Sequence, residues 1–204
     1  MPAFTLPPVP ETTARSIARV FHLYDPPLWL VTAAHEGRRG GLIATFAVRA
    51  SIVSHLPRMV LGIAQQHHTW GLIEAGGGFA LHLLYPEQLD LVWRFGLASG
   101  HDADKFAGIE ATSTPGGQPL IPGALAWLDC RVEGRLDSGD RSIYLAAVTA
   151  GATTGEAEPL GVRGLMAAAP PERQEALSAL YARDGQVDAA AIQAWRAARQ
   201  ADQA

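Results

Sequence analysis

The strongest constraint on the fold of this chain is a regular alternation of apolar and polar residues over residues 124–136. Successive side chains of a β-strand point to opposite faces of a sheet, so this alternation predicts one long strand with a single dry face. The dry face is expected to carry Ala126, Leu128, Cys130, Val132 and Leu136, and the opposite face Trp127, Asp129, Arg131, Glu133 and Arg135. A turn at residues 137–140 leads into residues 142–150, which are apolar on both faces. We therefore predict a long hairpin whose second strand is central in its sheet.

Shorter apolar runs earlier in the chain predict the rest of the sheet. Turns rich in glycine, proline and polar residues separate them, as is typical of β connections. The expected strands are residues 28–34, 41–48, 58–64 and 79–84. Short helices are expected at residues 70–75, opened by Thr69 and ended by three glycines, and at residues 86–95, opened by Pro86. A loop is expected over residues 112–123. This order of elements indicates a β-barrel with helices packed against it and not a series of alternating βαβ units.

The amino-terminal residues 1–11 are rich in proline and predict an extended arm. A helix is expected from Thr12 or Thr13 to about Tyr24, because apolar residues recur there at spacings of three and four. This terminus does not resemble a secretory signal. No apolar run approaches the ~20 residues needed to cross a bilayer, so we expect a cytoplasmic protein without a membrane segment.

The composition changes again after residue 150. Residues 151–170 are expected to be a linker with one short strand near residues 160–165. Two amphipathic helices are expected beyond it, at residues 171–183 and 187–201. The predicted division of the chain is an arm (1–11), a barrel domain (12–165) and a C-terminal helical extension (166–204).

Charge and motif content disfavour several functions. The chain of 204 residues has a formal net charge of −4, so it offers no large positive field for non-specific binding of nucleic acid. The single cysteine, Cys130, has no partner for an intramolecular disulfide and is expected to be an inert core thiol, and we expect no metal site. The fingerprints of Rossmann and P-loop folds are absent from the sequence. A hydrolytic triad of Ser51, His55 and Asp90 is rejected because no nucleophile elbow surrounds Ser51.

The strand at residues 41–46 combines small residues with a hydroxyl. Small side chains such as Ala44 allow a flat ligand to approach the backbone closely. Thr45 can also donate a hydrogen bond to a ring or phosphate oxygen. The alternative is a half-buried strand whose threonine bonds a neighbouring carbonyl, and taken alone this alternative is favoured.

The next candidate is the passage from a strand into a helix at residues 64–70. A helix N-terminus carries free N–H groups and partial positive charge, which suit a phosphate. Thr69 adds a hydroxyl there, and His67 or His68 can add donors. Phosphate binding and a plain helix cap are equally consistent with this pattern. A metal site ranks below both, because adjacent histidines do not converge on one ion.

Two further segments carry groups that could meet a ligand. In residues 101–106, Lys105 could bind a phosphate and Phe106 could stack on a flat ring. In the late turn, Arg141 could bind a phosphate or carboxylate through two parallel hydrogen bonds. The alternatives are a polar loop with a buried phenylalanine and a solvated hairpin turn, and each is favoured when its segment is taken alone.

The order of these segments resembles the flavin reductase-like family over about residues 15–150. The segments that carry the resemblance are GLIATF, ASIVSHLPRMVLGIA, HHTWGLIEAGGGFALHLL, EQLDLVWRFG, DKF, PLIPGALAWLDCRVEG and SGDRSIYLAAV. The resemblance implies a mainly β, FMN-binding split β-barrel of Greek-key type with peripheral helices and a helical C-terminal tail. It also implies a homodimer with the flavin in a groove near the dimer interface.

The same resemblance implies the site and its reaction. The ring and ribityl chain are expected to meet Ile43, Ala44, Thr45 and the segment around Ser51. The phosphate is expected to meet residues matching the stretch from Gln65 to Thr69. The residues predicted to bind the cofactor are Ile43, Ala44, Thr45, Ser51, Gln65, His67, His68, Thr69, Lys105 and Phe106. The typical reaction is hydride transfer from NADH or NADPH to FMN or FAD, which supplies reduced flavin to a partner oxygenase.

The sequence departs from the family pattern at several positions. Arg141 stands where many relatives have histidine near the nicotinamide, and it is our candidate nicotinamide contact. His82 replaces an asparagine, and residues 54–57 replace a DPP motif. One alternative is therefore a non-catalytic or electron-transfer flavin binder. Another, from a different class, is a dimer without flavin that is purely structural or binds haem through His67, His68 or His82. Residues beyond 170 lie outside the resemblance and are expected to clasp the partner subunit.

Overall fold

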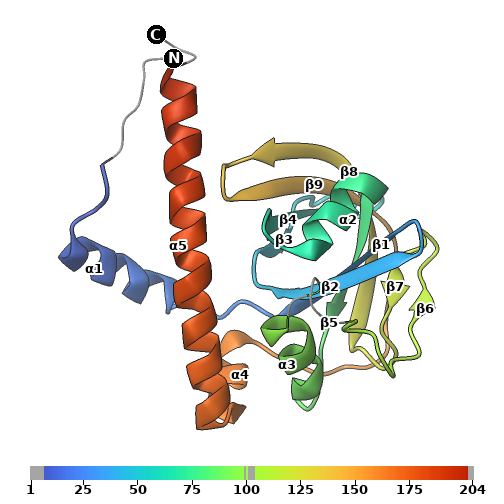
Figure 1. Ribbon diagram of the computed structural model, residues 1–204. Coiled ribbons are helices and arrows are strands. Elements are labelled where there is room, and N and C mark those ends of the chain that lie inside the picture. The colour runs from blue at the N-terminus through green and yellow to red at the C-terminus, as the bar shows by residue number, and fades with distance from the viewer. Residues whose placement is uncertain (1–6, 99, 101–103, 202–204) are drawn as a thin grey trace.

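The computed structural model describes residues 7–98, 100 and 104–201. Its centre is a curled sheet of seven antiparallel strands in the order β2-β1-β5-β8-β9-β4-β3 (Figure 1). The strands are β1 (Trp29–His35), β2 (Arg38–Ala44), β3 (Ala47–Arg49), β4 (Arg58–Ala64), β5 (Gly78–Leu83), β8 (Ala126–Asp137) and β9 (Arg141–Thr153). A small second sheet pairs β6 (Thr112–Ser113) with β7 (Pro119–Leu120), within the segment predicted to be a loop. This mainly β half-barrel with helices around it confirms the predicted fold class.

The sheet closes on itself where β2 gives way to β3. β2 pairs with β1 as far as Ala44, whereas β3 pairs with β4 from Ala47 onward. Between them, the carbonyl of Phe46 accepts a hydrogen bond from the amide of Gly62 at 2.9 Å. Thr45 and Phe46 therefore carry the chain from one edge of the sheet to the other. The prediction of one strand over residues 41–48 is wrong because the pairing partner changes at this point.

The long hairpin of β8 and β9 confirms the central prediction from the sequence. β9 lies between β8 and β4, so it is a central strand. The expected faces of β8 are only partly right, because the register shifts between Asp129 and Cys130 and again between Val132 and Gly134. Such bulges turn the following side chains toward the other face. Leu136, expected in the core, is accordingly 59% exposed. Asp129 precedes the first shift and is 1% exposed because the loop before β7 covers it, with the amide of Gly116 donating to its Oδ2 at 2.6 Å.

The apolar side chains form two clusters on opposite sides of the sheet. One fills the half-barrel, with Phe79 and Tyr144 among its largest members. The other packs outside it and includes Phe95 of a short helix and Phe106. Val31 belongs to the inner cluster and the neighbouring Leu30 to the outer one, as the alternation of a strand requires. The barrel wall is therefore covered on both faces at this point.

Helices α1 (Glu11–Phe21), α2 (His68–Gly76) and α3 (Leu89–Leu97) begin at residues other than those predicted. Pro10 precedes α1 in an extended conformation and no side chain caps it, so the expected cap by Thr12 or Thr13 is wrong. His67 precedes α2, which places Thr69 inside its first turn. The end of α2 is as predicted, because Gly77 adopts the left-handed conformation with φ of 67°.

The start of α3 is shifted because residues 85–88 form a turn of their own. The amide of Tyr85 donates to Oε1 of Gln88, and the amide of Gln88 donates to the carbonyl of Tyr85. Pro86 therefore lies inside this turn and precedes the helix instead of opening it. The helix itself buries Val92 and Phe95.

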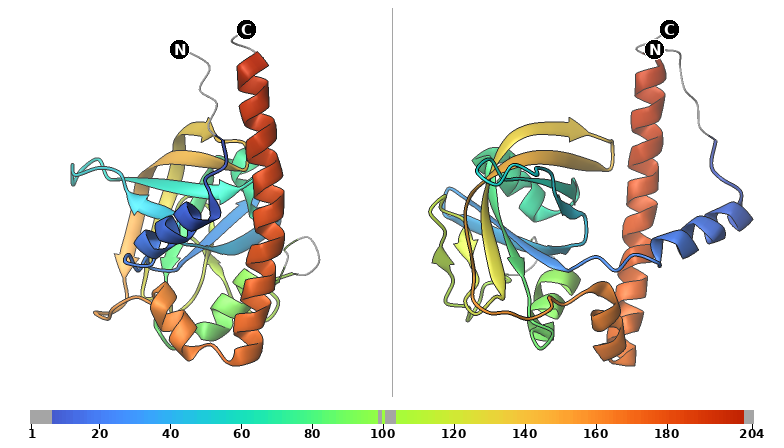
Figure 2. Two further views of the ribbon diagram at one scale, coloured as in Figure 1. Left: turned by 90° about the vertical axis from the view of Figure 1, so that its left-hand side faces the viewer. Right: turned by 180° about the vertical axis from the view of Figure 1, so that it is seen from behind.

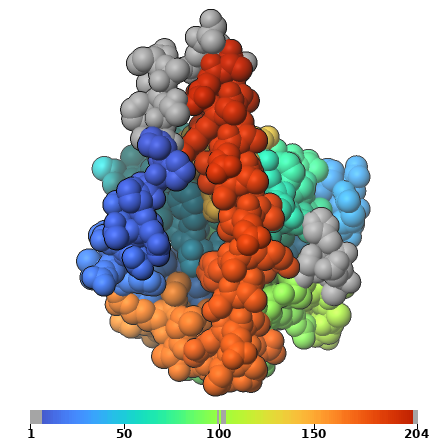
Figure 3. Space-filling model, turned by 60° about the vertical axis from the view of Figure 1, so that its left-hand side comes forward, coloured from blue at the N-terminus to red at the C-terminus, as the bar shows by residue number. Residues whose placement is uncertain are grey.

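The C-terminal region contains helices α4 (Val162–Ala168) and α5 (Pro171–Ala201). α4 replaces the strand expected near residues 160–165, where only one bridge, between Pro27 and Gly161, is formed. α5 is a single helix of 31 residues in place of the predicted pair. Gly185, at the expected break, lies within it, because one glycine costs a helix only about 1 kcal/mol. α5 runs along one face of the molecule and extends past the barrel (Figures 2 and 3). Among the described residues, no helix is long and apolar enough to cross a membrane.

Candidate functional site

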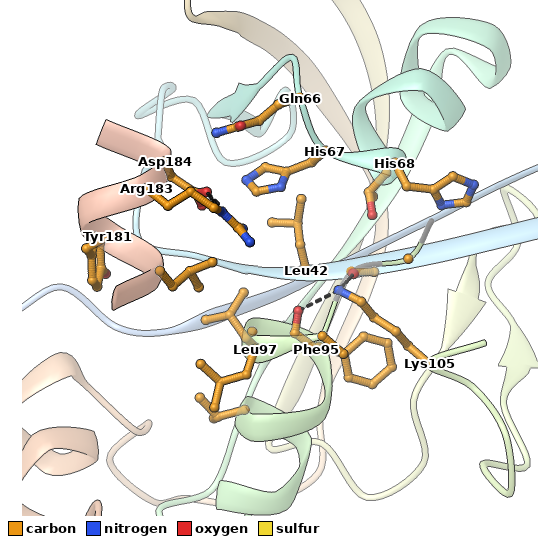
Figure 4. A pocket seen from close by; sticks show the side chains of 18 residues that line it. Leu42, Gln66, His67, His68, Phe95, Leu97, Lys105, Tyr181, Arg183 and Asp184 are labelled. Atoms are coloured by element: carbon orange, nitrogen blue, oxygen red, sulfur yellow. Dashed lines mark hydrogen bonds and ion pairs between the residues drawn. The ribbon is translucent and has the colours of Figure 1, made fainter. Parts of the chain in front are cut away.

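The main candidate site is a groove between β2 and α5. Its first compartment, of about 340 Å³, lies between β2, the start of α2, α3 and the middle of α5 (Figure 4). Its lining includes Leu42, Gln66, His67, His68, Thr69, Phe95, Lys105, Tyr181, Arg183 and Asp184. A second compartment of about 290 Å³ continues along β2 and is lined by residues 42–46, 62–64, Gln66, His67, Arg141, Tyr181, Asp184, Gly185 and Asp188. Because the two compartments share wall residues, we treat them as one β2–α5 groove.

Lys105 provides a buried positive charge in the first compartment. Its side chain is 8% exposed, and Nζ donates to the carbonyls of Gly41 at 3.0 Å and Phe95 at 2.8 Å (Figure 4). Burial lowers the pKa of Lys105 to about 8. Among the described residues, no carboxylate lies within ion-pair distance of this ammonium group. A buried cation held by carbonyl dipoles is well placed to attract an anion from the cleft.

The start of α2 forms the adjoining wall. His67 points toward α5, whereas His68 points away from it (Figure 4). Burial lowers the pKa of His67; Asp184 opposes this effect, and Lys105, Arg141 and Arg183 add to it. Lys105 and Arg183 line the first compartment together with His67, and Arg141 lines the second together with it, so cations from three parts of the chain gather around His67. Thr69 is buried in the first turn of the helix and does not cap it.

The second compartment combines the end of β2 with an ionic cluster. Ile43, Ala44 and Thr45 line it from the barrel side. On the opposite side, Arg141 Nη2 lies 2.8 Å from Oδ2 of Asp188. Arg141 Nε also donates to the carboxylate of Asp140. Arg141 is therefore engaged by two carboxylates, and the expectation of a solvated hairpin turn is wrong.

Comparison with known proteins identifies the family. A family model described as the flavin reductase like domain matches residues 21–192. The chain belongs to the flavin reductase-like family. The match covers most of α5, whereas the resemblance seen in the sequence ends near residue 150.

Several relatives of this flavin reductase-like protein are known. It is 33% identical over 144 residues to the high molecular weight rubredoxin of Moorella thermoacetica, a match covering 70% of this chain and 62% of that protein. It is 38% identical over 92 residues to HsaB of Rhodococcus jostii, the reductase subunit of a flavin-dependent monooxygenase, covering 45% of this chain and 46% of that subunit. The chain thus spans less than two thirds of the length of these two relatives.

Solved structures agree with this assignment. A homologue of nitrilotriacetate monooxygenase component B from Mycobacterium thermoresistibile superposes with a TM-score of 0.63 at 27% identity, covering 74% of this chain and 81% of that one. The NADH:FAD oxidoreductase SgcE6 of Streptomyces globisporus has a TM-score of 0.64 at 21% identity, covering 76% of this chain and 90% of that one. The second likeness concerns the fold alone.

Three residues predicted to bind the cofactor lie outside the groove of this flavin reductase-like chain. Phe106 is buried in the outer apolar cluster, with the edge of one ring against Phe95 and the guanidinium of Arg39 over its face, so it cannot stack on a ligand. Ser51 accepts a hydrogen bond from the amide of Val53 and lines neither compartment. Gln65 also lies outside both linings, and its neighbour Gln66 occupies the wall instead.

The residues that α5 contributes to the groove were not predicted from the sequence. Tyr181, Arg183, Asp184 and Asp188 line the groove, yet their spacing in the sequence is that of an ordinary surface helix. They lie there because α5 packs on the hairpin tip and, through Leu177, on the outer apolar cluster. The predicted residues 101–103 lie outside the described residues.

The histidines give little support to a haem or metal site. His82 is buried, its Nδ1 donates to the carbonyl of Leu30 at 3.0 Å, and its Nε2 accepts from the amide of Ile121 at 3.2 Å. Both ring nitrogens are therefore occupied. No group of three metal-binding side chains occurs in the part of the chain that the structure describes.

Proposed function

We propose that this chain binds FMN or FAD in the β2–α5 groove and reduces it with NADH or NADPH. The observation that carries the proposal is the buried ammonium of Lys105 in the first compartment, without a carboxylate partner among the described residues. A phosphate at this position would complete the coordination of the third N–H of Lys105. Membership of the flavin reductase-like family supports a flavin as the molecule that carries the phosphate.

The two compartments suit the two ends of a flavin nucleotide. In our proposal, Lys105 and the amides at the start of α2 bind the phosphate in the first compartment. The backbone of Ile43, Ala44 and Thr45 binds the rim of the ring in the second. β2 is an edge strand, so it has backbone groups that pair with no neighbouring strand. These groups are available to a planar ligand that carries donors and acceptors along one edge.

The residues of the groove bind and orient; they do not carry the redox chemistry. When bound, a flavin accepts a hydride from a reduced nicotinamide without a protein acid or base. The chain's own task is to hold the two rings face to face and to keep water away, and α5 covers the groove for this purpose. Arg141, our candidate nicotinamide contact, acts in this proposal mainly by holding α5 through Asp188.

The test is direct. Purified protein is titrated into FMN, and quenching of flavin fluorescence is followed; NADH and NADPH oxidation are then measured with and without added flavin. Saturable quenching with flavin-dependent nicotinamide oxidation supports a reductase. Quenching without oxidation selects the electron-transfer or non-catalytic flavin binder. Absence of quenching contradicts flavin binding altogether.

We further propose a homodimer. α1 has 11 residues, none of them buried, and an isolated helix of that length is not stable in water. Val20, Phe21 and Leu23 are exposed at its end, and Ile52, in the connection between β3 and β4, is 91% exposed. A second copy of the chain would cover both apolar surfaces through a twofold interface.

Phe21→Ser and Ile52→Ser are expected to convert a dimer to a monomer in light scattering, and Val9→Ser serves as an exposed control on the arm.

A flavin-dependent oxygenase as partner is also part of the proposal, because HsaB is the reductase subunit of such a system. The cytoplasmic location expected from the sequence stays a prediction.

A further inference from the structure

We propose that Arg183 of α5 binds the phosphate of the flavin nucleotide, so that the C-terminal helix supplies one side of the phosphate site. This inference rests on the proposed flavin binding and adds a residue that the sequence analysis did not assign.

α5 is fixed at two places with the groove between them. At its start, the guanidinium of Arg173 lies over the ring of Trp93 in α3, 5.6 Å from its centroid, and Leu177 packs against the outer apolar cluster. At the far end of the groove, in the second compartment, Asp188 pairs with Arg141 at the tip of the β8–β9 hairpin. The intervening part of α5 therefore lies across the groove as a bridge, and this part carries Arg183.

The second attachment is strengthened by a close contact at Gly139. This glycine has φ of 94°, and a Cβ atom built on it would lie 2.5 Å from Cβ of Trp195 and 3.0 Å from the carbonyl oxygen of Ala191. Only glycine fits such a backbone conformation at such a separation. The hairpin tip thus packs directly on α5, which explains how a helix without buried residues keeps a definite position.

Arg183 reaches into the first compartment with donors to spare. Its guanidinium and the carboxylate of Asp184 extend from α5 into the cleft (Figure 4). Oδ1 of Asp184 accepts from Nε at 3.0 Å and also lies 3.0 Å from Nη2. A guanidinium has about five N–H donors, so one carboxylate oxygen leaves several of them for a ligand. The side chain is 71% exposed, so a ligand can displace water there without disturbing the core.

The surrounding charges favour an anion between Arg183 and the barrel. Among the described residues that line the first compartment, Asp184 is the only acidic one, and it is already paired with Arg183. Lys105 faces the same space from the barrel side, and the start of α2 adds its amides. A phosphate in this space would be bound from both walls, with the planar fork of the guanidinium matching two of its oxygens.

The experiment compares FMN with riboflavin, which has the same ring and ribityl chain but no phosphate. Dissociation constants of both are measured by fluorescence quenching for the full-length chain and for Arg183→Gln. The wild type is expected to bind FMN more tightly than riboflavin. In Arg183→Gln, the affinity for FMN should fall about 5- to 20-fold, the scale of a charge-assisted hydrogen bond, and that for riboflavin should stay within about twofold.

Matched variants complete the design. Arg196→Gln removes the same charge from α5 at an exposed position that lines neither compartment, and it should leave both affinities unchanged. Arg183→Lys should retain part of the preference for FMN. An unchanged affinity of Arg183→Gln for FMN, or an equal loss for both ligands, would overturn the role of Arg183 while leaving flavin binding intact. A wild-type chain that binds neither ligand would overturn the proposed function as well.

Discussion

Arg141 and Asp188 join the tip of the β8–β9 hairpin to the middle of α5, with Nη2 of the arginine 2.8 Å from Oδ2 of the aspartate. Gln66 extends the cluster, since its Nε2 lies 3.4 Å from Oδ1 of Asp188. Burial raises the pKa of Asp188; Arg141 opposes the rise, and Asp140 and Asp184 add to it. The distance between Arg141 and Asp188 establishes the ion pair. The raised pKa of Asp188 indicates that burial and the two neighbouring carboxylates offset part of the attraction. We therefore assign the pair a modest energy and a positional role.

Asp188→Asn tests this positional role. The change removes the charge that attracts Arg141 but keeps the shape of the side chain, so α5 should leave the groove more often. Partly exposed ion pairs contribute about 0.2–1 kcal/mol, which corresponds to an increase of up to about fivefold in the dissociation rate of FMN. The rate is measured by stopped-flow recovery of flavin fluorescence.

The control for this experiment is Glu133→Gln, which breaks an ion pair with Arg58 on the same hairpin but away from its tip and from both compartments. The double variant Arg141→Asp, Asp188→Arg exchanges the two charges, so it should restore the slow dissociation of FMN. Equal dissociation rates in the wild type and Asp188→Asn would show that the pair does not hold the helix over the ligand.

Lys105 makes the binding of FMN dependent on pH. Its pKa of about 8 in the free protein means that the ammonium loses its proton as the pH rises through 8. A bound phosphate, dianionic above its second pKa of about 6, favours the charged form. The dissociation constant of FMN should therefore rise by up to about tenfold between pH 7 and pH 9. Riboflavin should show no such rise, and a common pH profile for both ligands would exclude Lys105 as the phosphate contact.

His82 makes the stability of the fold dependent on pH in the acidic range. Burial lowers its pKa to about 4, against an ordinary value near 6.5, although its hydrogen bond to Leu30 opposes the shift. Between these values the unfolded chain takes up a proton at His82 and the folded chain does not, so stability is lost as the pH falls from 6.5 to 4. The full loss from this group is about 3 kcal/mol.

Urea unfolding at pH 7, 6 and 5 measures this effect. His82→Leu should be less stable at pH 7, by about 1–3 kcal/mol, because it leaves two backbone partners unsatisfied, but its stability should depend less on pH. His67 also has a lowered pKa and contributes a slope of the same sign in both proteins. Parallel slopes in the wild type and His82→Leu would contradict the assignment.

Cys130 is expected to be unreactive in the folded protein. Burial, with a smaller contribution from Asp129, raises the pKa of its thiol to about 12. At pH 8 the reactive thiolate is then roughly a thousandfold less populated than in an ordinary cysteine. Labelling with a chromogenic disulfide should be slow in buffer and rapid in urea above the unfolding midpoint. Rapid labelling of the native protein would show that β8 opens locally.

The fold was largely predictable because its strands carry local signals. The alternation over residues 124–136 and the doubly apolar run after it are enough to predict the hairpin and the central place of β9. The crossing at Thr45 and Phe46 could not be predicted, because it depends on which distant strand pairs with each half of the segment. The faces of β8 beyond Val132 were missed for a similar reason, since a bulge is set by the partner strand.

The site was predictable only in part. Ile43, Thr45, His67 and Lys105, which line the groove, could be selected from the sequence because small residues on a strand and polar groups at a helix start have chemical consequences that a sequence shows directly. Arg183 has no such signal, since it is one exposed arginine on a long helix. Its place in the groove follows from two contacts remote in sequence, those of α5 with the hairpin tip and with the outer apolar cluster.

The contact between Trp195 and Gly139 has a practical consequence. The indole lies where α5 meets the hairpin tip, so its environment changes whenever the two separate. The fluorescence lifetime of Trp195 therefore reports whether α5 is docked on the hairpin tip, and it can be measured without a bound ligand. In a variant with phenylalanine at the other tryptophan positions, the fluorescence of Trp195 would give the rate at which the groove opens, independently of the ligand that enters it.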